Sequence, residues 1–123
     1  RTFHHPVVLR IDGQADGTGK FRIKVTDGAG GYEPGKLVRD ETKNWDERMM
    51  KMIRSRFAAE KFFEIPAYEE GVLGCDGSEW IIEAVRDGKY HIVSRWSPES
   101  GPVRTLGMQM IEIAIGGDLT PIY

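Results

Sequence analysis

Hydrophobic and polar positions alternate with a period of two along two stretches near the start of the chain. The alternation runs through residues 3–12 and 20–26, and a third strand is expected over 36–42. Such alternation is typical of strands that bury one face. Because a turn rich in Gly and Asp, residues 13–19, separates the first two stretches, we expect them to form a hairpin. Pro6 favours an edge strand or the first residues of a strand.

The pattern after the third expected strand has the period of a helix. Asn44 followed by Glu47 fits a capping box at the helix start. Hydrophobic residues then recur at helical spacing, at Trp45, Met49, Met52, Ile53 and Phe57. The helix is expected to end near residues 60–61, because Pro66 cannot continue it and residues 62–65 resemble an extended segment packed on the core.

Two further hydrophobic runs, Glu79 to Arg86 and Lys89 to Trp96, flank the dipeptide Asp87-Gly88. This dipeptide tolerates the positive φ values of a two-residue turn, so the runs predict a β-hairpin. The turn also sets which residues face each other. The predicted pairs are Arg86 with Lys89, Val85 with Tyr90, Ala84 with His91, Glu83 with Ile92, Ile82 with Val93, Ile81 with Ser94 and Trp80 with Arg95.

A second helix is expected after the break at residues 97–102. Pro102 suits the first turn of a helix, and Gly116-Gly117 ends it. Its apolar stripe consists of Val103, Leu106, Met110, Ile113 and Ala114. The resulting order, β-β-β-α-β-β-α with short turns, predicts an α+β fold in which an antiparallel sheet of about five strands carries two helices on one face.

Composition and charge narrow the classes of function. With 123 residues, of which 40% are hydrophobic, residues 1–123 are expected to form a single domain. The 17 basic and 19 acidic residues nearly cancel, so no overall field favours nucleic acid or an anionic membrane. Cys75 is the only cysteine, which excludes an internal disulfide. No apolar run reaches the roughly 18–20 residues of a membrane span, so we expect a soluble domain.

The segment 30–36, Gly-Gly-Tyr-Glu-Pro-Gly-Lys, has the glycine and lysine spacing of a phosphate-binding loop. Its context does not fit, because Leu37 stands in place of the metal-binding Ser or Thr, Pro34 removes an amide donor, and a strand rather than a helix is expected to follow. We interpret the segment as a connection between strands, in which Tyr32 and Lys36 are candidates for contacting a ligand.

The hairpin over residues 79–96 carries the remaining candidates. In the predicted register Trp80, His91 and Arg95 share one face, with Trp80 opposite Arg95 and in position for a cation–π contact. Glu83 emerges on the other face, which disfavours a tight acid–base pair with His91. A structural role, in which Arg95 covers the indole, competes with a role in ligand binding.

No metal site is predicted. His4 and His5 are adjacent on an expected strand and therefore point to opposite faces, so one ion would rarely use both. A site that combines one of them with His91 is a lower-ranked hypothesis, since no metal-ligand spacing supports it.

Five segments resemble an uncharacterised bacterial protein family. They are Arg1 to Val7, Gly28 to Leu37 with the pattern G-A-G-G-Y-x-P-G-K, Phe62 to Pro66, Asp76 to Glu83 with D-G-x-x-W-x-x-E, and Tyr90 to Pro98 with Y-H-x-x-x-R-W-S-P. The family has no assigned activity, so the resemblance transfers no catalytic residue. It implies an exported or membrane-anchored protein of the bacterial envelope whose anchor precedes Arg1, with a cytoplasmic location as the alternative.

These observations together favour a non-catalytic binding or interaction domain of the bacterial envelope. Its candidate binding residues are Tyr32, Lys36, Trp80, Glu83, His91, Arg95 and Trp96. The expected partner is a small ligand or a protein, and no cofactor or nucleic acid is expected. Arg10, Arg22 and Lys24 on the open face of the sheet would extend the surface toward an anionic ligand. The alternative is a small hydrolase or other acid/base enzyme that uses His91 with Asp76 or Glu83, which requires a cleft.

Overall fold

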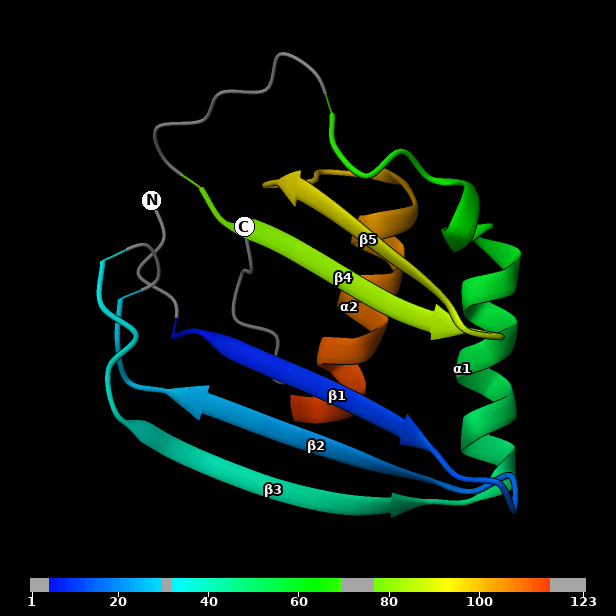
Figure 1. The fold of residues 1–123 in the computed structure, drawn as a ribbon. Coiled ribbons are helices and arrows are strands. Elements are labelled where there is room, and N and C mark those ends of the chain that lie inside the picture. The colour runs from blue at the N-terminus through cyan, green and yellow to red at the C-terminus, as the bar shows by residue number, and fades with distance from the viewer. Residues whose placement is uncertain (1–4, 30–31, 70–76, 116–123) are drawn as a thin grey trace.

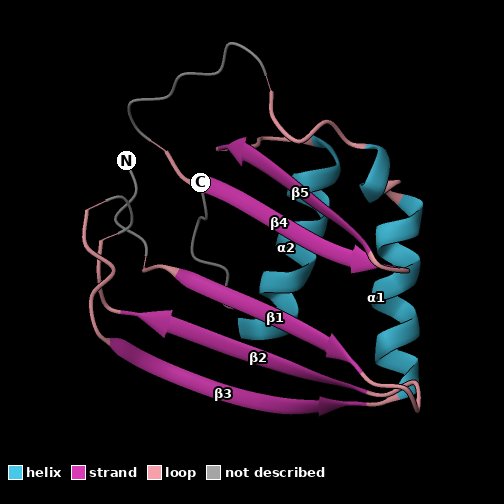
Figure 2. Ribbon diagram, in the orientation of Figure 1, coloured by secondary structure: helices cyan, strands magenta, loops and turns pink. Residues whose placement is uncertain are grey.

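The computed structural model describes residues 5–29, 32–69 and 77–115, and it has the α+β class and the element order expected from the sequence (Figure 1). The elements are β1 (Val7–Gly13), β2 (Gly19–Thr26), β3 (Leu37–Trp45), α1 (Glu47–Ala59), the 3₁₀ turn η1 (Phe62–Glu64), β4 (Glu79–Arg86), β5 (Lys89–Trp96) and α2 (Gly101–Ile115). All five strands pair antiparallel, but they divide into two hydrogen-bonded sheets, β1-β2-β3 and β4-β5 (Figure 2).

The three-stranded sheet has an apolar inner face and a charged outer face. Phe21 and Ile23 of β2 point inward and are fully buried, whereas Arg22 between them is exposed. On the outer face Arg10 Nε lies 2.9 Å from Asp12 Oδ1, and Lys24 Nζ lies 3.5 Å from Asp40 Oδ2. The basic residues that the sequence offered to an anionic ligand are therefore held in ion pairs.

The helix α1 begins two residues later than the capping-box pattern predicts. Asn44 and Trp45 belong to the end of β3, and the side chain of Asp46 caps the helix by accepting a hydrogen bond from a first-turn N–H at 2.8 Å. Trp45 stays in the strand because its buried ring stacks on Phe21, with the ring centroids 4.7 Å apart. The predicted helix end is confirmed, since Glu60 is the C-cap.

Residues 62–64 form a 3₁₀ turn instead of the extended segment that the sequence predicts. Lys61 has φ 49°, a left-handed conformation that reverses the chain at the end of α1. The reversal buries Phe62 completely, with its ring 5.1 Å from that of Phe57 and 5.3 Å from that of His91 between centroids. This turn therefore anchors the β4-β5 hairpin to α1.

The register predicted for the β4-β5 hairpin is confirmed pair by pair, from Arg86 with Lys89 to Trp80 with Arg95. Asp87 and Gly88 form the turn with φ of 53° and 74°, the positive values that a two-residue connection requires.

Both helices lie on the same side of the two sheets, as predicted (Figure 1). The core under the three-stranded sheet consists of Phe21, Ile23, Trp45, Met50, Ile53 and Ala114. The core under the hairpin consists of Phe62, Trp80, Val93, Val103 and Leu106. Because α2 contributes buried residues to both cores, it ties the two sheets together, and Phe57 of α1 packs against both cores as well.

Candidate functional site

Trp80 and His91 share one face of the hairpin, as predicted, and it is the inner face. Each has a partner within the chain. Trp80 is buried, and its Nε1 donates to Ser78 Oγ at 2.8 Å. His91 is half-buried, and its Nε2 lies 2.8 Å from the carbonyl oxygen of Ile65. These contacts hold the hairpin against the segment that follows α1.

The cation–π contact expected for Trp80 is made by a different arginine. The guanidinium above the Trp80 ring is that of Arg104, 5.1 Å from the ring centroid. Arg95, the cross-strand partner of Trp80, instead donates from Nη2 to the carbonyl oxygen of Pro66 at 2.8 Å and from Nη1 to that of Ala67 at 3.3 Å. Carbonyl oxygens give the charged guanidinium directional hydrogen bonds, which accounts for the difference.

Glu83 and Trp96 lie on the outer face of the hairpin, by the alternation of residues along β4 and β5. Glu83 accepts a hydrogen bond from the Tyr90 hydroxyl at 2.8 Å, and this bond raises the pKa of Tyr90 above its ordinary value. The structure therefore does not bring Glu83 and His91 together as the acid/base hypothesis requires. Asp76, the other carboxylate of that hypothesis, lies outside the described residues.

Tyr32 and Lys36 belong to the connection between β2 and β3, in the other sheet. The Tyr32 side chain is 86% exposed, and the backbone N–H of Lys36 donates to Asp27 Oδ1 at 2.6 Å. The predicted binding residues are thus divided between this loop and the two opposite faces of the hairpin.

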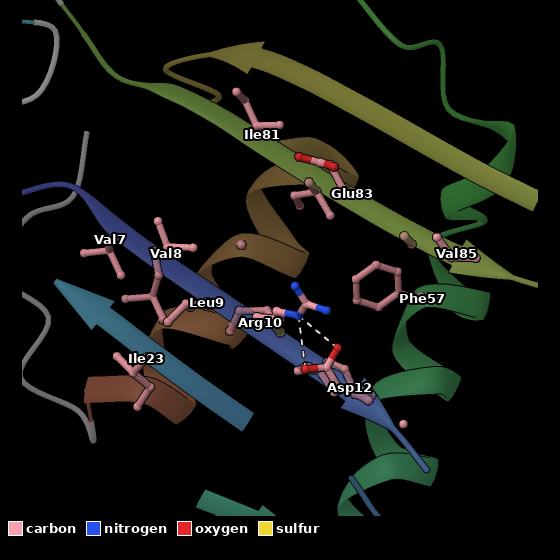
Figure 3. A pocket seen from close by; sticks show the side chains of 18 of the residues that line it. Val7, Val8, Leu9, Arg10, Asp12, Ile23, Phe57, Ile81, Glu83 and Val85 are labelled. Carbon is pink, nitrogen blue, oxygen red and sulfur yellow. Dashed lines mark hydrogen bonds and ion pairs between the residues drawn. The ribbon is translucent and has the colours of Figure 1, made fainter. Parts of the chain in front are cut away.

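A cleft with a volume of about 2810 Å³ lies between the two sheets (Figure 3). Unbroken runs of residues line it on both sides, 5–15 on the side of β1 and 77–86 on the side of β4. Successive residues of a strand point to opposite faces, so an unbroken run means that the strand edge itself borders the cleft. Among the predicted residues, Trp80, Glu83 and Trp96 take part in the lining.

The edge of β1 presents unpaired main-chain groups to this cleft. The hydrogen bonds Thr26 N to Pro6 O (3.1 Å) and Gln14 N to Thr18 O (2.8 Å) show that the even-numbered residues of β1 bond to β2. In an antiparallel pair the residues between them direct their N–H and C=O groups to the opposite edge. These residues are Val7, Leu9, Ile11 and Gly13, and within the described residues no strand pairs with that edge.

The edge of β4 on the other side of the cleft also presents main-chain groups that no described strand pairs with. The bond Ser97 N to Ser78 O (2.7 Å) and the two-residue turn after Arg86 show that the even-numbered residues of β4 bond to β5. The remaining main-chain groups face the cleft. They belong to Glu79, Ile81, Glu83 and Val85. Two strand edges with alternating donors and acceptors therefore border one opening, with β1 and β4 running in the same direction (Figure 1).

The floor of the cleft comes from the two helices. Met50 and Phe57 of α1 and Met110 and Ile111 of α2 line it. Their side chains are apolar, so a segment lying between the strands would set alternate side chains on a hydrophobic surface.

The outermost strand edges of the two sheets are protected in other ways. On β3 the inward-facing positions near the edge carry the charged residues Arg39, Glu41 and Lys43, a pattern that discourages further strand pairing. On β5 the edge is covered, because Ser94 N donates to Ala67 O at 2.8 Å. Only the two edges that face the cleft lack such protection among the described strands.

Comparison of the chain with protein-family models, with curated proteins and with solved structures found no match. Within residues 5–29, 32–69 and 77–115, no three His, Cys, Asp or Glu side chains gather as a metal site would require. In the same part of the chain, neither α1 nor α2 has the length and apolar character needed to cross a membrane.

The sequence interpretation missed the edge residues Leu9, Ile11 and Ile81, because main-chain groups carry no sequence signature. One signal pointed toward Leu9 and Ile11. Pro6 favoured an edge position for the first strand, and β1 is the edge strand of its sheet among the described residues.

Proposed function

We propose that this chain is a binding domain that accepts an extended segment of another polypeptide as an additional strand between β1 and β4. The observation that supports the proposal is the facing pair of strand edges, whose unpaired main-chain groups point into one cleft from Leu9 and Ile11 on one side and Ile81 and Glu83 on the other. The proposal keeps the non-catalytic binding role expected from the sequence and moves the binding site.

An extended polypeptide matches this cleft better than a small molecule does. Main-chain donors and acceptors recur along each edge at every second residue, about 6.7 Å apart, and only another strand repeats with that spacing. A strand between the edges directs its own N–H and C=O groups alternately to β1 and to β4, and so pairs with both. The cleft volume of about 2810 Å³ also exceeds the roughly 300–1,000 Å³ of a typical small-molecule pocket.

The partner is a segment of another protein. Bacterial origin and association with the envelope remain predictions from the resemblance described above.

A fluorescein-labelled octapeptide of alternating Val and Thr tests the proposal by fluorescence anisotropy. We expect saturable binding, and two analogues N-methylated at alternate residues should each bind at least about tenfold more weakly, because each loses the N–H donors that bond to one edge. The negative control is the same octapeptide with the amide nitrogens of both alternate sets of residues methylated. Equal binding of all peptides would overturn the proposal.

Two proline variants of β4 distinguish an effect on peptide binding from an effect on stability. Ile81→Pro removes an N–H that faces the cleft from an exposed position, so the protein should fold and bind the octapeptide more weakly than the matched Ile81→Ala variant. Ala84→Pro removes an N–H that bonds to β5 and should destabilise the fold by about 3 kcal/mol. If Ile81→Pro binds as well as Ile81→Ala, the β4 edge takes no part in binding.

The oligomeric state tests a second copy as the occupant. We expect a monomer in sedimentation equilibrium without peptide. A dimer whose cleft-facing amides of β1 and β4 are already protected from hydrogen exchange would place a second copy in the cleft and contradict the proposal.

A further inference from the structure

The outer rim of the cleft carries unequal charge on its two sides. On β1, Arg10 Nε donates to both carboxylate oxygens of Asp12, at 2.9 and 3.0 Å, so these two charges balance. On β4, Glu79 accepts from Ser94 Oγ at 2.7 Å and Glu83 accepts from the Tyr90 hydroxyl at 2.8 Å. Both donors are neutral, and among the described residues no cation forms an ion pair with either glutamate.

The outward residues of an inserted strand would lie beside these glutamates. Directly opposite residues of neighbouring strands share one face of a sheet, and Cβ atoms of such pairs lie about 4.5–5.5 Å apart. The side chains of β4 that face outward are Glu79, Ile81, Glu83 and Val85. A bound strand would therefore meet, on this side, a carboxylate, an apolar group, a second carboxylate and a second apolar group in turn.

Other positive charges on this face are farther away or already paired. Arg22 and Lys24 belong to β2, one strand beyond β1, and Lys24 pairs with Asp40. Arg22 lies 3.8 Å from Asp12. Screening weakens charges at that separation from the cleft more than it weakens direct cross-strand neighbours.

The floor of the cleft favours apolar side chains at the inward-facing residues of a bound strand. Met110 contributes a flexible side chain to an apolar surface that also includes Phe57 and Ile111. Methionine adapts to ligands of different shape, so this floor tolerates a variety of apolar side chains.

We propose that the preferred partner segment alternates apolar residues, which face the helices, with outward residues that include Lys or Arg opposite Glu79 and Glu83. This inference rests on the strand insertion proposed above and adds the chemical class of the partner, a basic amphipathic strand.

Three octapeptides test the charge preference. Each has the alternating Val and Thr sequence, with Val facing inward and Thr facing outward. Two of the outward Thr residues, with one outward Thr left between them, are replaced by Lys, by Gln or by Glu. In low salt we expect the Lys peptide to bind about 3- to 10-fold more tightly than the Glu peptide, with the Gln peptide between them, and the difference should shrink in high salt.

Two variants assign the preference to the cleft. Glu83→Gln should reduce the Lys-over-Glu ratio by about 2- to 5-fold. Asp40→Asn, which removes a carboxylate of the same outer face on β3, should leave the ratio unchanged.

The possible outcomes separate this inference from the proposed function. If all three peptides bind alike and N-methylation still weakens them, the strand insertion stands and the preference for basic residues is wrong. A Glu peptide that binds more tightly than the Lys peptide would also overturn the inference, because Arg10 would then dominate the rim. If none of the peptides binds, both proposals fail.

Discussion

The placement of the hairpin on α2 predicts a strong coupling between Gly107 and Trp80. Gly107 lies on α2 directly beneath the indole, and a Cβ added there would overlap Cε3 and Cζ3 of Trp80. Replacing Gly by Ala within a helix stabilises a protein by about 1 kcal/mol. Overpacking a filled core costs about 1–3 kcal/mol, so Gly107→Ala should destabilise the protein by about 0–2 kcal/mol.

The sign of this effect should reverse when the indole is made smaller. Trp80→Phe removes the outer carbon atoms that the new methyl group would meet, so adding Gly107→Ala to that variant should raise the free energy of unfolding by about 1 kcal/mol. The expected interaction energy between the two substitutions is about 1–3 kcal/mol. Equilibrium urea denaturation of the four proteins measures it. Additive effects would show that Trp80 does not pack on Gly107, and the hairpin would then sit elsewhere on α2.

Three further predictions follow from local contacts. Asp46→Ala should lower the free energy of unfolding by about 1 kcal/mol, whereas Asn44→Ala should change it by less than about 0.5 kcal/mol. A larger loss for Asn44→Ala than for Asp46→Ala would show that Asn44 is the N-cap, as the sequence pattern predicted. Phe62→Ala should cost about 3–5 kcal/mol in the same assay, and a cost below about 1 kcal/mol would contradict its complete burial. Glu83→Gln should lower the Tyr90 pKa toward its ordinary value in a phenolate absorbance titration, because the carboxylate raises it. The stabilisation from this bond should be present below that ordinary value and be lost as the pH rises through the folded-state pKa, and an unchanged titration would refute the bond.

The parts of the fold that depend on neighbours in the sequence could be predicted. The Asp87-Gly88 turn determines its own backbone conformation, so the register of β4 and β5 followed from it and is confirmed. The apolar stripe of α2 was also predictable, because helical spacing places Val103, Leu106 and Ala114 on one face, and all of them are buried.

The parts that depend on distant contacts could not be predicted in this way. Asn44 and Asp46 are both good N-caps, and the stacking of Trp45 on Phe21 in β2 selects the later start. Arg95 was expected over an indole, but carbonyl oxygens of residues 66–67, far away in the sequence, bind its guanidinium. Local patterns do not encode such choices.

The candidate site was the least predictable feature for the same reason. The sequence predicts one sheet of about five strands, and only the pairing in space shows that β1 and β4 are edges of separate sheets. Three of the seven predicted residues line the cleft, yet its binding groups are main-chain atoms, which are the same in every residue type.

Amide hydrogen exchange of β1 and β4, measured residue by residue by NMR with and without the Lys octapeptide, tests the central claim most directly. We expect fast exchange in the free protein at the cleft-facing amides of Leu9, Ile11, Ile81 and Glu83, and slow exchange at their ladder-bonded neighbours Arg10 and Ile82. Added peptide should slow the first group and leave the second unchanged. Protection of the first group in the free protein, or none after the peptide is added, would contradict a cleft that accepts a strand.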